Sequence, residues 1–117
     1  MRKFTAMLPL VLAVSAAFAQ NQAPAGSVER GLTAYLKYEC QTCHGTVGQG
    51  GERGAGPKLT PNPFPYEAFV SQTRAPQRNM PSYRSQHLSD QDLADIYAYI
   101  MSIRPPAPAK DIPLLDF

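Results

Sequence analysis

Apolar residues recur at helical spacing in three segments of the chain, and the first follows a short polar leader. Leu32, Tyr35 and Leu36 are three and four residues apart, which is the spacing of one helix face. Ser27 stands ahead of them and is a residue type that caps helix N-termini. This pattern predicts an amphipathic helix over residues 27–39.

The clearest pattern is "LSDQDLADIYAYIMSIRPP", close to the end of the chain. Ser89 is a candidate N-cap with Asp92 at the capping-box spacing, and Leu88 and Leu93 have the spacing of a hydrophobic staple. Pro105 and the proline after it end the helix. The expected buried stripe consists of Leu93, Ile96, Tyr97, Ile100 and Met101.

A third, shorter helix is expected over residues 66–73, opened by Pro65. Residues 45–65 and 74–87 show neither helical nor strand periodicity and are rich in turn residues. The pattern therefore indicates an all-α domain with long loops. Because loops of this length are unusual in a small domain, and three short helices supply only a thin core, we expect a large buried cofactor to organise them.

The N-terminal residues have the composition of a secretory signal peptide. Arg2 and Lys3 precede an apolar run over residues 7–18, and Ala17-Phe18-Ala19 is a small-x-small cleavage site. An uncleaved membrane anchor is the alternative. We expect the divisions to be a signal peptide at 1–19, a flexible leader at 20–26, a domain at 27–104 and a proline-rich extended tail at 105–117.

Cleavage after residue 19 changes the charge balance. The full chain has a formal net charge of +2, but without Arg2 and Lys3 it has nine basic and nine acidic residues. A neutral chain gives no electrostatic reason to expect nucleic acid as a partner. We therefore expect an exported, periplasmic protein with no membrane span after signal cleavage and with protein partners.

Both cysteines lie in the pentapeptide Cys40-Gln41-Thr42-Cys43-His44. This C-x-x-C-H pattern is the attachment signature of c-type haem, in which two thiols form thioethers and the histidine binds iron. A disulfide, a redox dithiol and a zinc site are the alternatives. Zinc needs about four ligands, and a thioredoxin-like dithiol needs a preceding strand that the sequence does not show.

Residues 27–103 resemble a class I monohaem cytochrome c. The resemblance rests on a helix leading into "CQTCH", on "GAGPKL", on "NMP" and on "LSDQDLADIYAYI". It implies an all-α fold of three to four short helices and long loops around one covalently bound haem c. It also implies that the first and last helices cross, with Gly31, Tyr35 and Tyr97 at the contact.

The second axial ligand of the iron is predicted to be Met80. Met80 is an isolated methionine in the polar loop "QRNMPSY", whereas Met101 fits the core and His87 fits a solvated loop. His87 or an open position is the alternative to Met80. The resemblance also points to Met80, and it implies that the carbonyl of Pro57 accepts a hydrogen bond from the ring of His44.

His44 and Met80 as the two iron ligands would favour electron exchange and leave no position for a substrate. We therefore expect an electron carrier, not an enzyme, that connects a donor dehydrogenase or quinol-oxidising complex with an acceptor, either alone or as a subunit of a larger oxidoreductase. The alternative is a haem-based sensor or small peroxidase-like enzyme with an exchangeable sixth ligand. The basic residues expected around the haem loops are Arg53, Lys58, Arg74, Arg78 and Arg84.

Overall fold

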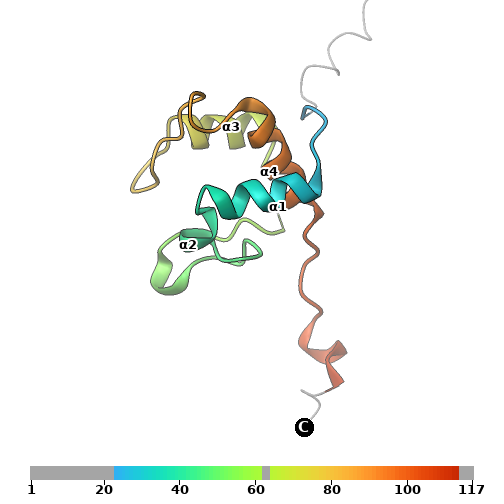
Figure 1. Ribbon diagram of the computed structural model, residues 1–117. Coiled ribbons are helices and arrows are strands. Elements are labelled where there is room, and N and C mark those ends of the chain that lie inside the picture. Colours follow the sequence, from blue (N-terminus) through green and yellow to red (C-terminus); the bar gives the residue numbers. More distant parts are fainter. Residues whose placement is uncertain (1–22, 62–63, 114–117) are drawn as a thin grey trace, which may run out of the picture.

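The computed structural model describes residues 23–61 and 64–113, so the predicted signal peptide lies outside the described residues. Within the described part the chain is helical and contains no strand, which confirms the all-α prediction (Figure 1). The α-helices are α1 (Val28–Lys37), α2 (Cys40–His44), α3 (Tyr66–Arg74) and α4 (Asp90–Ser102), and the 3₁₀ turns are η1 (Glu52–Gly54) and η2 (Ala109–Asp111).

α1 begins where the sequence predicts and ends two residues earlier. The side chain of Ser27 accepts a hydrogen bond from the backbone N–H of Arg30, which caps the helix. Glu39 adopts a left-handed conformation with φ of 60°, and this residue separates α1 from α2. The chain therefore changes direction immediately before the cysteine motif.

The capping signals of α4 are confirmed. The side chain of Ser89 accepts a 3.0 Å hydrogen bond from the backbone N–H of Asp92. Leu88 and Leu93, which flank the cap, are both buried, as expected for a hydrophobic staple. These local interactions set where α4 begins.

α1 crosses α4 at very short range because of one glycine. A Cβ atom added at Gly31 would lie 1.9 Å from the carbonyl oxygen of Asp95 and 2.8 Å from the Cβ of Tyr99. The rings of Tyr35 and Tyr99 pack beside this contact with their centroids 5.4 Å apart. The expected crossing is present at Gly31 and Tyr35, but its aromatic residue on α4 is Tyr99, so the prediction of Tyr97 is wrong.

Two residues of the predicted α4 stripe lie on other faces of the helix. The half-buried ring of Tyr97 packs on α3, with centroid distances of 5.2 Å to Tyr66 and 5.4 Å to Phe69. Met101 is 51% exposed, so its prediction as a core residue is wrong. The face of α4 that meets α1 runs through Tyr99 and Ile100, and the rotation of about 100° per residue carries Met101 away from it.

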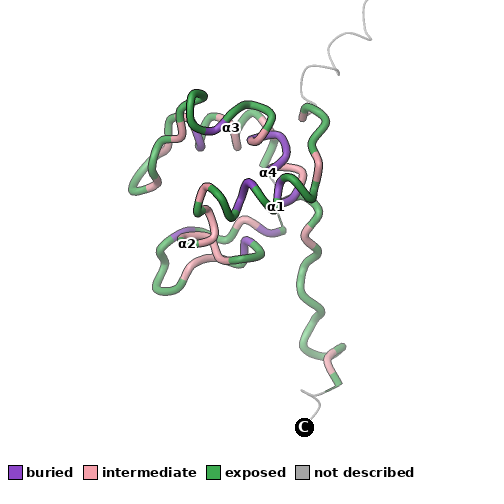
Figure 2. The backbone as a smooth tube through the Cα atoms, in the orientation of Figure 1, coloured by how far each residue is buried: buried purple, intermediate pink, exposed green. Residues whose placement is uncertain are grey.

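The core is small and concentrated where α1 and α4 meet (Figure 2). The buried residues of this cluster are Ala34, Tyr35, Leu88, Leu93, Ile96, Tyr99 and Ile100. Cys40, Leu59, Phe69, Val70 and Tyr83 are partly buried around it. The segments 45–61 and 75–88 therefore rest on a core made mainly by two helices; η1 is the one helical turn within them, and Leu88 is their one fully buried apolar residue in the cluster.

Beyond α4 the chain leaves the domain as an extended segment (Figure 1). Residues 104–111 are all exposed, and the single turn η2 is their only regular structure. Ile112 is half-buried, and residues 114–117 of the predicted tail lie outside the described residues. A search of the described helices finds none that is long and apolar enough to cross a membrane.

Asp95 is a buried carboxylate that ties α4 to the start of α1. Arg30 donates two hydrogen bonds to it, at 2.7 and 3.0 Å, and the backbone N–H of Ser27 donates a third at 2.7 Å. Gln91 donates a fourth from the same helix at 3.1 Å. These donors, with Arg30 foremost, lower the pKa of Asp95 from its usual 3.8 to about 2, although burial acts in the opposite direction.

We expect Asp95→Asn to destabilise the fold by about 2–3 kcal/mol at neutral pH, because the hydrogen bonds to a charged acceptor are weakened. A carboxylate with a lowered pKa stabilises the folded state fully above its usual pKa, and this stabilisation is lost as the pH falls from about 4 towards 2. Denaturant unfolding at a series of pH values should therefore show that the free energy of unfolding falls more steeply with decreasing pH in the wild type than in the variant.

Asp111→Asn is the matched control for this experiment. Asp111 is exposed in η2, so its replacement should change the stability by less than about 0.5 kcal/mol. If the free energy of unfolding depended on pH equally in the wild type and in Asp95→Asn, the role of the buried carboxylate would be contradicted.

Candidate functional site

The cysteine motif forms α2, a helix of little more than one turn. The backbone carbonyl of Glu39 accepts hydrogen bonds from the N–H and the hydroxyl of Thr42, at 3.1 and 2.7 Å, which starts the helix. Cys40 and Cys43 are free thiols three residues apart, so they lie on one face of α2. Both are partly buried.

The state of the thiols distinguishes between the interpretations of the motif. Burial raises the pKa of Cys40 to about 11, which keeps this thiol neutral. A redox dithiol requires the opposite shift, because its attacking sulfur is a thiolate at neutral pH. Within the described residues, no three His, Cys, Asp or Glu side chains come together as a metal site, so the zinc interpretation lacks its ligands.

The ring of His44 is held by the loop that follows it. Its Nδ1 lies 2.8 Å from the carbonyl oxygen of Pro57. Since a carbonyl only accepts hydrogen bonds, Nδ1 carries the proton and donates it, and Nε2 keeps its lone pair for another partner. A Cβ atom at the neighbouring Gly56 would lie 3.0 Å from Nδ1 and 2.5 Å from the carbonyl oxygen of Cys43, so this close approach requires glycine.

The predicted ligand Met80 lies in the loop between α3 and α4. In Figure 1 this loop lies above α1 and α2 lies below it, and both extend past the end of α1 that leads into the cysteine motif. Met80 is half-buried, and its sulfur accepts a hydrogen bond of 3.9 Å from Nε2 of Gln72. The alternative ligand, His87, is exposed in a turn next to the buried Leu88.

Tyr83 connects the Met80 loop to the cysteine motif. Its hydroxyl donates a 3.0 Å hydrogen bond to the carbonyl oxygen of Tyr38, at the junction of α1 and α2. Burial raises the pKa of Tyr83, and the two thiols contribute in the same direction. Tyr83 therefore ties the loop that carries Met80 to the junction of α1 and α2, directly before the cysteine motif.

Arg74 organises the Met80 loop from the end of α3. Its guanidinium donates to the carbonyl oxygens of Tyr83 and Leu88, at 2.9 and 2.7 Å, and pairs with the exposed carboxylate of Asp90. The hydroxyl of Ser82 also donates to the carbonyl oxygen of Arg74 at 2.6 Å. Arg74 is thus engaged within the domain, whereas the other four basic residues expected around the loops are exposed.

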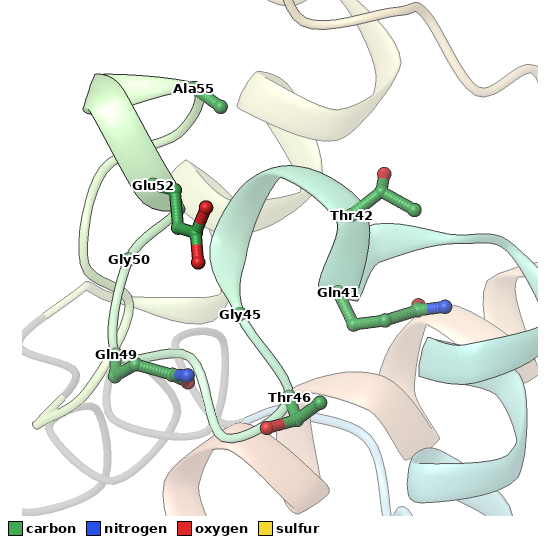
Figure 3. Close-up of a pocket in the computed structure, with 9 residues that line it drawn as sticks. Gln41, Thr42, Gly45, Thr46, Gln49, Gly50, Glu52 and Ala55 are labelled. Carbon is green, nitrogen blue, oxygen red and sulfur yellow. The ribbon is translucent and has the colours of Figure 1, made fainter.

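A polar pocket of about 310 Å³ lies on the side of α2 that carries Gln41 and Thr42 (Figure 3). Its remaining lining comes from the loop after the motif, namely Gly45, Thr46, Gln49, Gly50, Gly51, Glu52 and Ala55. Neither thiol, the ring of His44 nor Met80 lines it. The candidate attachment residues therefore lie outside this pocket.

A helical fold built on an N-terminal and a C-terminal helix that cross, with C-x-x-C-H on a short helix between long loops, defines a c-type cytochrome. Residues 26–100, more than half of the chain, match the model of the family described as cytochrome c oxidase, cbb3-type, subunit III, and the chain belongs to this family. Searches of curated proteins and of solved structures find no significant match.

Membership of this family means that the cofactor is covalently attached haem c, and the domain is an electron-transfer module with a small class I cytochrome c fold. The residues fit the group: two free thiols share one face of α2, and the hydrogen bond of His44 to Pro57 uses Nδ1 and leaves Nε2 for the iron. The C-x-x-C-H motif at Cys40, Cys43 and His44 occurs once in the chain.

The roles of several residues that shape the site were not identified from the sequence. Arg74 is one of five basic residues near the loops, and only its place in the last turn of a short helix hinted that it could reach nearby carbonyls. Tyr35 and Tyr99 carry hydroxyls at buried positions, where phenylalanine would pack equally well. Because a buried tyrosine normally has a hydrogen-bond partner, tyrosines at predicted core positions were the one indication in the sequence that their hydroxyls bind a polar group.

We expect Arg74→Ala to destabilise the Met80 loop and to reduce the free energy of unfolding by about 2 kcal/mol, because two carbonyl groups lose a charged donor. The pair with Asp90 contributes little, since that carboxylate is 85% exposed. Denaturant unfolding measures the stability, and limited proteolysis measures the cleavage rate within residues 75–88.

Arg84→Ala is the control, since Arg84 is an exposed arginine of the same loop. It should leave both measurements close to those of the wild type. The proposed role of Arg74 fails if the two variants are cleaved at the same rate.

Proposed function

We propose that this chain is an exported carrier of single electrons that connects a donor dehydrogenase or quinol-oxidising complex with an acceptor. The observation that supports this most directly is the arrangement at His44. Its Nδ1–H is bound to the carbonyl of Pro57 at 2.8 Å, which leaves Nε2 available, and the two cysteines of the same short helix are free thiols. This donor set suits an iron porphyrin attached through both sulfurs.

Each residue of the site has a proposed role. Cys40 and Cys43 form the thioether bonds, and His44 binds the iron through Nε2. Pro57 fixes the orientation of the imidazole, as hydrogen-bonded neighbours of metal ligands generally do. Met80 supplies the second axial ligand through its sulfur. When bound, the haem iron supplies one-electron chemistry between its ferric and ferrous states.

Met80 as an iron ligand would distinguish an electron carrier from a haem enzyme or sensor. A neutral thioether opposite a histidine favours the ferrous state and raises the reduction potential. Gln72, whose Nε2 donates to the sulfur of Met80 at 3.9 Å, lies where it can further reduce the electron density on this sulfur. With His44 and Met80 both holding the iron, the haem would exchange electrons and would leave no position for oxygen or peroxide.

We further propose that the chain works as a small subunit held on a larger oxidoreductase. The family is described as a subunit of a cytochrome c oxidase, which is consistent with such an assembly. The tail supports the same proposal, because residues 107–111 are exposed and extend away from their own domain. An extended, proline-rich segment loses little entropy on binding and is suited to docking on a partner.

We expect Met80→Ala to remove the second axial ligand while both thioether bonds stay intact. The ferric protein should lose the weak far-red absorption band of methionine-ligated haem, its reduction potential should fall, and the ferrous form should bind carbon monoxide rapidly. Acid–acetone extraction should leave the haem on both the wild type and the variant.

His87→Ala is the matched control, and it should keep the wild-type spectrum. Rapid binding of carbon monoxide by the wild type would instead support a sensor or a peroxidase-like enzyme with an exchangeable ligand. Unchanged spectra in Met80→Ala would exclude Met80 as the ligand.

Removal of residues 105–117 should separate docking from electron transfer. Because these residues lie beyond the domain, the truncated protein should keep its absorption spectrum and reduction potential. Its co-purification with a larger oxidoreductase after mild extraction should be lost. A truncated protein that is recovered with the same partner in the same amount as the full chain would refute the docking role of the tail.

A further inference from the structure

Two buried hydroxyl groups converge on the backbone directly after His44. The hydroxyl of Tyr35 donates to the carbonyl oxygen of Gly45 at 2.7 Å, and the hydroxyl of Tyr99 donates to the carbonyl oxygen of Thr46 at 2.9 Å. Tyr35 comes from α1 and Tyr99 from α4. Both helices of the crossing therefore bind two consecutive peptide groups that follow the predicted iron ligand.

The two tyrosines are held rigidly. Tyr35 is fully buried and Tyr99 is 7% exposed, and their rings pack against each other beside Gly31. Because the helices are in contact at this glycine, neither ring can swing away without separating them. Burial raises the pKa of both phenols, so both hydroxyls keep their protons and remain donors.

His44 is also held from the other directions. Its carbonyl oxygen accepts a 2.8 Å hydrogen bond from the N–H of Gly50, and its ring is bound to Pro57. The N–H of Gly45 donates to the carbonyl oxygen of Gln41 at 2.9 Å, which closes the end of α2. The tyrosine hydroxyls add the links from this turn to the helix core.

We propose that Tyr35 and Tyr99 are positioning residues for His44: the helix crossing sets the orientation of the imidazole through hydrogen bonds to Gly45 and Thr46. The inference rests on the proposed function, in which His44 binds the haem iron. The proposal gives a structural role to two hydroxyl groups that are not needed for the packing between α1 and α4. Phenylalanine at either position would fill the same volume.

The test compares Tyr35→Phe, Tyr99→Phe and the double variant with Tyr97→Phe. The hydroxyl of Tyr97 donates to the carbonyl oxygen of Phe64 at 2.6 Å, so this control loses one tyrosine–carbonyl hydrogen bond at a place remote from the motif. Each single change keeps the ring and its packing. Circular dichroism and thermal unfolding of the holoprotein establish that the variants are folded.

The orientation of the imidazole is read from the electron paramagnetic resonance spectrum of the ferric protein. Amide hydrogen exchange at Gly50, whose N–H is bound to the carbonyl of His44, reads the backbone independently of the iron. We expect broader g-value distributions and at least tenfold faster Gly50 exchange in Tyr35→Phe and Tyr99→Phe, with the largest effects in the double variant. Tyr97→Phe should have the same g-value distribution and the same Gly50 exchange rate as the wild type.

Spectra and exchange rates in Tyr35→Phe and Tyr99→Phe equal to those of the wild type would overturn the inference. An equal change in Tyr97→Phe would also overturn it, since the effect would then reflect general stability. If acid–acetone removed the haem from the wild type, the proposed function itself would fail. That result is distinct from a covalently attached haem whose spectrum the tyrosines do not influence.

Discussion

The close crossing of α1 and α4 at Gly31 is the constraint on which the rest of the structure depends. Because no side chain separates the two helices there, their relative position is set by backbone contact and not by adaptable packing. Asp95 ties the helices together at one end of the crossing, and the rings of Tyr35 and Tyr99 pack beside it. The long loops, which have little regular structure, take their positions from this rigid pair.

Features encoded by neighbouring residues could be predicted from the sequence. The start of α4 is determined by Ser89 and Asp92 within one helical turn, and α1 starts at Ser27 for the same reason. The C-x-x-C-H motif is equally local, so the family and the cofactor could be inferred before any arrangement in space was known. The end of α1 was less predictable, because it depends on the left-handed conformation of Glu39.

Features that depend on distant residues were predicted less well. Tyr97 and Tyr99 are both tyrosines on α4, and which of them meets α1 depends on how the helix is rotated about its axis. The predicted stripe was correct at Leu93, Ile96 and Ile100, but the buried face is turned towards Tyr99, and this leaves Met101 exposed. Arg74 binds backbone carbonyl groups. Because every residue has such a group, the sequence does not indicate which ones an arginine will bind. The ligand residues could be named, but the framework that holds them could not.

The exposed segment after α4 has a consequence for how the domain reaches its partners. The eight exposed residues 104–111 span at most about 25 Å, the length that they would have in a polyproline II conformation. If the chain is a subunit held through this segment, as proposed, the domain could move only within a limited distance of the point where it is anchored. Its effective concentration at two neighbouring docking positions would then be in the millimolar range. Such a tether would let one redox centre alternate between donor and acceptor without diffusing away from the assembly.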